Sequence, residues 1–252
     1  IKYYGEALKL KAGYEDQALF YQAKSYGFDD DEDAKIKNLL DIINNYTKSK
    51  YMLTSIYEVA IEYKNKSEYD KSLRYFNQIL TDYPNSNLIV SCKIEIANIY
   101  YKKWDYLRSE KEYKDILAAY GSDNNVCANA VLGLKDVYTA LKQPEKVSEL
   151  ASQYACADIS MDEQEGLYYT PAYEAYKDSS YVTAIPQLEK YLDRFPEGKY
   201  VAEAQFFLAT SYYATKETEK GIAAYRKLLE GPNNSYTEFS AQRVAVYLYN
   251  TG

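Results

Sequence analysis

Apolar and polar positions along the chain form blocks that return at a fixed interval. The stretch Ile79–Pro84, "ILTDYP", has counterparts that begin at Ile42, Ile116 and Tyr191. The starting positions 42, 79, 116 and 191 differ by 37, 37 and 75 residues, and 75 is 37 + 38. Self-similarity at a period of this size predicts a repeat protein in which one supersecondary unit recurs along the chain.

Each repeat has the pattern of two amphipathic helices. In the repeat 53–84, apolar residues fall three and four positions apart in two blocks of about a dozen residues, which is the helical period. The polar stretch Lys64–Ser67 separates the blocks. Ser67 and Asp70 have the spacing of a capping box, so we expect them to cap the second helix. Each repeat is therefore predicted to be a helix–turn–helix hairpin.

The order of large, small and aromatic positions in these hairpins resembles the tetratricopeptide repeat. The matching residues in the repeat 53–84 are Ile56, Val59, Ala60, Tyr63, Ser72, Phe76 and Pro84. We expect the small residues Ala60 and Ser72 to lie where the two helices cross closely. The resemblance covers roughly residues 16–250 in six repeats, and it implies an all-α, right-handed solenoid of stacked antiparallel hairpins forming a single domain, 1–252.

The period points to one branch of that family. The usual tetratricopeptide period is about 34 residues, whereas these repeats return after 37 and end in an aromatic residue and proline. Both features resemble the cell-envelope branch, which includes a periplasmic TolA-binding coordinator and an outer-membrane assembly lipoprotein. The resemblance implies a non-catalytic scaffold that binds a protein or peptide, in the periplasm or at the outer membrane.

The repeat is least regular over 156–171. Thr170-Pro171 has the sequence of a helix cap followed by a first-turn proline, so we expect the helix there to begin late. A divergent repeat and a hinge both remain open for this stretch. Residues 3–12 and 236–250 each match a single helix, and the C-terminal one is either a cap or the start of a further repeat. Because the sequence opens on Ile1, we expect a mature or excised piece.

The composition argues against nucleic-acid binding and catalysis. The net charge is -7 and the pI about 4.9, whereas nucleic-acid binders carry a basic face. Histidine is absent, which removes the commonest general base and metal ligand. We expect no enzymatic activity, no cofactor and no metal, and we interpret the acidic run 29–33 as a solvated turn. No apolar run approaches the ~18 residues of a membrane span.

Tyrosine is unusually frequent, with 32 residues among 252. Some tyrosines fill packing positions of the repeat, but seven aromatic residues fall where the first helix of a hairpin would line the inner surface of the solenoid. Tyrosine combines a rigid apolar ring with a polar tip and is common in binding surfaces. The predicted partner-binding residues are Phe20, Tyr57, Tyr101, Tyr169, Tyr173, Tyr176 and Tyr213. The alternative for each is core packing.

The inner-surface positions also bear on two other kinds of ligand, a terminal carboxylate and a glycan. A chaperone-type groove clamps a terminal carboxylate with Lys, Arg and Asn, but the corresponding positions here hold Tyr57, Ile61, Asn98, Tyr101 and Asp136. Only Asn98 fits, so we do not expect that clamp. An aromatic groove can also stack on sugar rings, so capture of a glycan in an outer-membrane uptake system is the alternative function.

Two of the three cysteines occupy mirrored positions in the fourth hairpin. Cys127 precedes the turn at 142 by 15 residues, and Cys156 follows it by 14. The antiparallel arrangement would bring the two side by side, so a disulfide and two buried thiols both remain open. A disulfide would fit an oxidising envelope. Cys92 has no mirrored partner and is expected to be a free core thiol.

Overall fold

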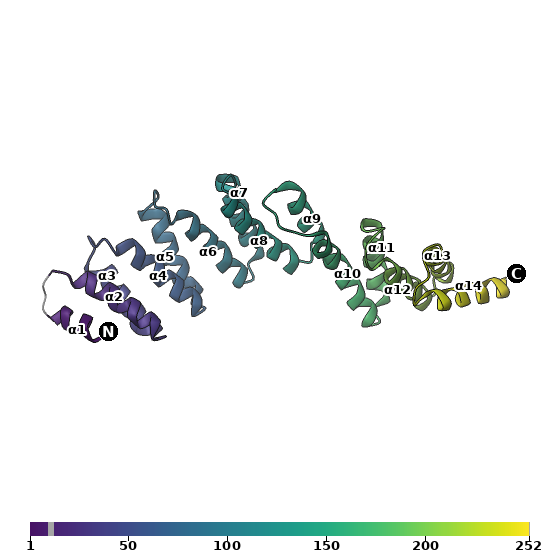
Figure 1. Cartoon of the computed structure of the whole chain (residues 1–252), viewed down its shortest axis with the longest axis horizontal. Coiled ribbons are helices and arrows are strands. Elements are labelled where there is room, and N and C mark those ends of the chain that lie inside the picture. Colours follow the sequence, from purple (N-terminus) through teal and green to yellow (C-terminus); the bar gives the residue numbers. More distant parts are fainter. Residues whose placement is uncertain (10–12, 252) are drawn as a thin grey trace. The chain divides into compact units, whose positions relative to one another are not determined.

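The computed structural model of the protein describes residues 1–9 and 13–251. That part of the chain contains fourteen helices and no strand, so the predicted all-α class is confirmed (Figure 1). The helices are α1 (Lys2–Lys9), α2 (Glu15–Phe28), α3 (Glu32–Asn45), α4 (Met52–Asn65), α5 (Tyr69–Asp82), α6 (Ile89–Lys102), α7 (Tyr106–Tyr120), α8 (Asn124–Ala140), α9 (Pro144–Gln153), α10 (Met161–Lys177), α11 (Tyr181–Arg194), α12 (Val201–Ala214), α13 (Thr218–Leu229) and α14 (Thr237–Thr251).

Five of the six predicted hairpins appear as packed pairs of consecutive helices, whereas the chain passes from one compact unit to the other between the helices of the fourth, α8 and α9. Helix α2 packs on α3, α4 on α5, α6 on α7, α10 on α11 and α12 on α13. The single helix predicted over 236–250 is α14. The one predicted over 3–12 corresponds to α1, and positions 10–12 lie outside the described residues.

The helices form two compact units. Unit 1 comprises Ile1–Leu141 with Gln153–Ala157, and unit 2 comprises Lys142–Ser152 with Asp158–Gly252. The chain therefore passes between the units around α9, just before the stretch 156–171 whose repeat pattern is weak. That the chain forms one continuous solenoid stays a prediction.

The predicted close crossings within hairpins are confirmed. Ser72 and Ala60 are both fully buried, and the Ser72 hydroxyl donates a hydrogen bond of 2.6 Å to the Ala60 carbonyl oxygen. One repeat later, the Ser109 hydroxyl donates to the Ala97 carbonyl oxygen at 3.0 Å. A small side chain on each helix lets the backbones approach closely enough for this bond, so both positions require small residues.

Overpacking one crossing tests the register. Ala97 is fully buried, whereas Ala118 is exposed on α7. We expect Ala97→Leu to lower the free energy of unfolding by about 1–3 kcal/mol, because the larger side chain would push α6 and α7 apart. Ala118→Leu should change it by less than about 0.5 kcal/mol. Urea unfolding followed by circular dichroism measures both, and equal midpoints for the two variants would show that the register is wrong.

The turn inside every hairpin contains a non-glycine residue in the left-handed region. These residues follow the repeat period and have φ between 55° and 66°: Asp30, Ser67, Trp104, Lys142, Ser179 and Lys216. In the second hairpin the Glu68 amide donates to the Tyr63 carbonyl oxygen at 2.8 Å, which is the Schellman bond that ends a helix. The predicted capping box at Ser67 is wrong, because α5 has Glu68 as its N-cap and no side chain bonds there.

Glycine at such a position should stabilise the protein. A left-handed backbone costs an L-residue roughly 1–2 kcal/mol, and glycine avoids most of that cost at the expense of greater freedom when unfolded. We therefore expect Ser67→Gly to raise the free energy of unfolding by about 0.5–1 kcal/mol. The matched control is Ala118→Gly on the exposed side of α7, which should lower it by about 1 kcal/mol. If both variants are destabilised in thermal unfolding, Ser67 does not adopt this conformation.

The helix over 156–171 begins earlier than predicted. Helix α10 starts at Met161 and runs through Pro171, so Thr170-Pro171 is not its cap. Ser160 is the N-cap, and its side chain accepts a hydrogen bond from the Glu163 amide at 3.1 Å. Tyr169 and Ala172, on either side of the proline, are buried in the core of unit 2. Their burial holds the helix together where the proline removes one backbone hydrogen bond.

Candidate partner-binding surface

The seven predicted binding residues divide between the two units. Phe20, Tyr57 and Tyr101 belong to unit 1, and the four others belong to unit 2. Phe20 and Tyr169 are only 8% and 7% exposed and lie in core clusters, so packing accounts for both. The remaining five are half-buried and present part of their rings to solvent.

In unit 1 the first helices carry paired charges beside the predicted tyrosines. Lys64 of α4 pairs with Glu95 of α6 at 2.8 Å. Asn98 accepts a hydrogen bond of 2.5 Å from the Tyr113 hydroxyl, so the one residue that fitted a carboxylate clamp is already engaged. Burial and the nearby carboxylate of Glu95 raise the pKa of Tyr57. Lys64, Glu95 and Asn98 are therefore all engaged with one another or with Tyr113 inside unit 1.

In unit 2 the first-helix surface is mostly aromatic. Equivalent positions on α10, α12 and α14 are 37 residues apart in the sequence. We use "aromatic face" for the half-buried rings on this surface, which are Tyr173, Tyr176, Phe206, Tyr213 and Tyr247. The sequence-based prediction did not include Phe206 and Tyr247. Phe206 lies one repeat of 37 residues after Tyr169, and Tyr247 lies two repeats, 74 residues, after Tyr173.

The rings of the aromatic face are held by other rings. Tyr176 stacks on Phe207, with ring centroids 4.1 Å apart, and Phe206 stacks on Tyr236 at 4.6 Å. Tyr213 lies 6.0 Å from the ring of Tyr225. The two stacks cover one side of the rings of Tyr176 and Phe206 and fix their orientation. The face therefore offers a partner preorganised ring edges and hydroxyl groups, which lowers the entropy lost on binding.

A half-buried carboxylate links α10, α12 and the residue that precedes α14. Glu203 of α12 accepts hydrogen bonds from the hydroxyls of Tyr169, at 2.6 Å, and Tyr236, at 2.9 Å. Burial and the Glu203 carboxylate both raise the pKa of Tyr169 and of Tyr236, so both phenols stay protonated as donors. Because two hydroxyls bond to its carboxylate, Glu203 is a structural link between Tyr169 and Tyr236.

One cation lies at the edge of the aromatic face. The guanidinium of Arg243 on α14 sits over the ring of Phe239, 4.9 Å from its centroid, and 6.0 Å from that of Tyr213. Arg243 is exposed, and it forms no ion pair with any described residue. This residue too was missed in the sequence, although it occupies the repeat position of Tyr169 and Phe206.

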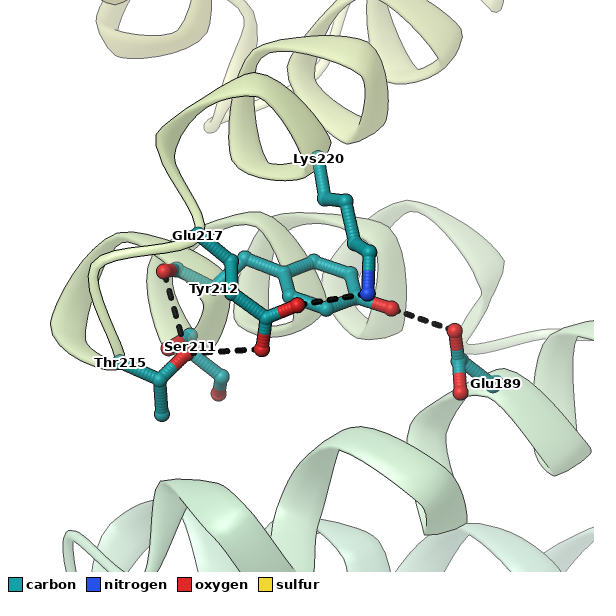
Figure 2. Close-up of polar contacts among 6 residues, drawn as sticks. All are labelled: Glu189, Ser211, Tyr212, Thr215, Glu217 and Lys220. Atoms are coloured by element: carbon teal, nitrogen blue, oxygen red, sulfur yellow. Dashed lines mark hydrogen bonds and ion pairs between the residues drawn. The ribbon is translucent and has the colours of Figure 1, made fainter.

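A separate cleft of about 560 Å³ lies between α11, α12 and α13. It exists because Ala223 and Ala224 present small side chains to it. Figure 2 shows its polar contacts: the Tyr212 hydroxyl points to the Glu189 carboxylate, and Lys220 extends over the Tyr212 ring to pair with Glu217. Glu189, Tyr212 and Lys220 are therefore engaged with neighbouring groups.

The acidic run 29–33 has structural partners. Asp31 caps α3 by accepting a hydrogen bond from the Ala34 amide at 3.1 Å, and Asp33 pairs with Lys66 at 2.6 Å. Within residues 1–9 and 13–251, no group of three or more acidic or sulfur ligands is arranged to hold a metal ion.

Cys127 and Cys156 are joined by a disulfide, with their Cα atoms 6.0 Å apart. Cys127 lies in the first turn of α8, and Cys156 follows the end of α9. Both belong to unit 1, so the bond fastens the segment Gln153–Ala157 to the helix α8 of that unit. Cys92 is buried without a bond, and burial raises its pKa to about 12.

Family models match two parts of the chain. Residues 59–86, which span the second hairpin, match the tetratricopeptide repeat model. The resemblance of this hairpin to the tetratricopeptide repeat is thereby confirmed. Residues 161–248 of this repeat protein match the YfiO model, described as an outer membrane lipoprotein, and that match covers α10 to α14 and with them the aromatic face. The resemblance to the cell-envelope branch is thereby confirmed.

Solved structures similar to this repeat protein are distant in sequence. A tetratricopeptide repeat protein from Parabacteroides merdae ATCC 43184 is 9% identical, with 92% of this chain and 90% of that chain covered and a TM-score of 0.45. MamA from Desulfovibrio magneticus RS-1 is 14% identical over 85% of this chain and 93% of that chain, with a TM-score of 0.43. A search of the curated proteins found no match.

Proposed function

We propose that this repeat protein is a non-catalytic scaffold that binds a protein partner through its first-helix surface. The aromatic face of unit 2 carries the proposal, and Tyr57 and Tyr101 of unit 1 are proposed as further binding residues. Half-buried tyrosines held by neighbouring rings have the properties of binding hot spots, because they bury large apolar area and lose little side-chain entropy.

We further propose that the scaffold works in the bacterial cell envelope, in the periplasm or attached to the outer membrane. Two observations support this location. The YfiO model matches residues 161–248, and the Cys127–Cys156 disulfide suits an oxidising compartment. In the part of the chain that the structure describes, no helix is both long and apolar enough to span a bilayer.

The packing of the rings favours a protein over a glycan. Sugar rings stack on an open aromatic face, but Tyr176 and Phe206 each have a ring face covered by Phe207 and Tyr236. What remains exposed is better suited to side chains and backbone amides. Within the described residues, the hydroxyls of Tyr173 and Tyr213 have no hydrogen-bond partner and are available to such groups.

The test compares capture of envelope proteins and of glycans by matched variants. We expect Tyr173→Ala and Tyr213→Ala each to weaken retention of a captured protein by tenfold or more, since a hot-spot truncation costs about 2 kcal/mol. The control is Leu107→Ala, which removes an exposed apolar side chain from α7, outside the first-helix surface. Thermal unfolding checks that all three variants stay folded at the temperature of the binding assay.

Two results would reject the proposed function. Retention on a glycan array that the tyrosine variants abolish would establish sugar capture instead. Protein retention that is equal in wild type, both tyrosine variants and Leu107→Ala would mean that the aromatic face is not the binding surface.

A further inference from the structure

The charge environment of the aromatic face restricts the chemistry of its partner. Arg243 forms no ion pair with the described residues, and Glu203 is engaged by two tyrosine hydroxyls. Arg243 is therefore a cation without an ionic partner among the described residues of this face, although the whole chain carries a net charge of -7. A complementary partner presents a negative group at this point.

The stacking of Arg243 selects a carboxylate. The aromatic rings of Phe239 and Tyr213 attract the face of the guanidinium. No described residue accepts a hydrogen bond from its N–H groups, so they are available to a ligand. A planar guanidinium presents a fork of donors that matches the two oxygens of a carboxylate, and ring contacts that hold the fork reduce the entropy lost when the pair forms.

The surroundings of Arg243 indicate where that carboxylate lies in the partner. Phe239 precedes Arg243 by one turn of α14 and is 39% exposed, and Tyr247 follows it by one turn. Apolar rings therefore flank the cation on both sides along the helix. A segment lying here contacts rings before and after its charged residue, which fits a side-chain carboxylate within a chain better than a carboxylate at a chain end.

From these observations, and resting on the proposed function, we infer that Arg243 anchors the side-chain carboxylate of an internal Asp or Glu in the partner. The bound segment is extended and has apolar residues on both sides of the acidic one. Its apolar side chains contact the aromatic face, and its carboxylate forms a paired hydrogen bond with the Arg243 guanidinium.

The test uses the full chain and two libraries of nine-residue peptides with acetylated and amidated ends. Both libraries vary Leu, Val, Phe and Tyr on either side of a fixed central residue, which is Glu in one and Gln in the other. We expect wild-type protein to retain the Glu library about 10–100-fold better than the Gln library, the range for a hydrogen bond to a charged group. Retention should fall as salt rises.

Three variants complete the test. Arg243→Gln should abolish the preference for Glu, and Arg243→Lys should keep only part of it, because lysine has the charge without the planar fork. Arg226→Gln, at an exposed position on α13, should retain the full preference. Each variant is checked by thermal unfolding, and the exposure of both arginines makes loss of the fold an unexpected result.

The outcomes separate this inference from the proposed function. Equal retention of both libraries, lost in Tyr173→Ala, would overturn the carboxylate anchor and leave the proposed function intact. A Glu preference that survives in Arg243→Gln would also overturn the anchor. A third library has central Gln and a free C-terminal carboxylate, and it should bind no better than the amidated Gln library. Stronger binding by this third library would contradict recognition of an internal carboxylate. If wild type retains none of the libraries, the anchor is rejected, while protein capture still tests the proposed function.

Discussion

Replacing Cys127 and Cys156 by Ser should lower the free energy of unfolding by about 3–4 kcal/mol. The bond joins residues that are 29 positions apart in the sequence. In the chain-entropy model, closing a loop of this size in the unfolded chain stabilises the folded protein by about 3–4 kcal/mol, and removing the bond loses that stabilisation. The loop contains all of α9, so the change should also free Gln153–Ala157 from unit 1.

Urea unfolding with and without dithiothreitol measures this effect. Reductant should shift the midpoint of the wild type and leave that of the double Ser variant unchanged. Alkylation gives an independent readout: under denaturing conditions without reductant only Cys92 should react, and after reduction all three cysteines should. Native protein should not react at neutral pH, because burial raises the pKa of Cys92 to about 12 and keeps its thiol protonated. Three reactive thiols before reduction would show that the disulfide does not form.

Two glycines inside helices should respond in opposite directions to alanine. A Cβ at Gly133 of α8 would lie 2.1 Å from the Cζ atom of Tyr113, whose ring is 2% exposed and has no space to move. A Cβ at Gly166 of α10 would meet nothing within 4 Å. We expect Gly133→Ala to lower the free energy of unfolding by about 2–3 kcal/mol through overpacking, and Gly166→Ala to raise it by about 1 kcal/mol through helix propensity.

The comparison tests the packing of Tyr113 against α8 with matched chemistry. Both variants add one methyl group to a helix interior, so their intrinsic helix preference changes equally, and thermal unfolding reports the difference in packing. Stabilisation by Gly133→Ala would mean that the Tyr113 ring does not lie against α8.

Features set by local spacing could be predicted from the sequence. The helical period places Ala97 and Ser109 at a helix crossing, and the structure confirms that crossing through their hydrogen bond. The start of α10 was predicted wrongly, because proline usually marks a helix end and the burial of Tyr169 and Ala172 that overrides it is a tertiary effect. The left-handed turn residues were missed since Ser67 and Trp104 are not residue types that favour φ > 0.

The candidate surface was only partly predictable for a related reason. Position in the repeat identifies which residues lie on the first helix, but burial depends on neighbours from other helices. Tyr169 is a packing residue because Tyr200 stacks on its ring, with ring centroids 4.2 Å apart, and because its hydroxyl donates a hydrogen bond to the Glu203 carboxylate. Arg243 was not predicted as a binding residue, because the sequence does not show that its guanidinium lies over the rings of Phe239 and Tyr213.

Photo-crosslinking tests the central proposal most directly. A photoreactive phenylalanine derivative replaces Tyr173 on the aromatic face, and in a second protein it replaces Val182, which is 78% exposed on α11. After irradiation in envelope extract, we expect a discrete crosslinked protein from position 173 and none from position 182, with the crosslink suppressed by Tyr213→Ala. Crosslinking that is equal at both positions, or absent at 173 and present at 182, would contradict binding at the aromatic face.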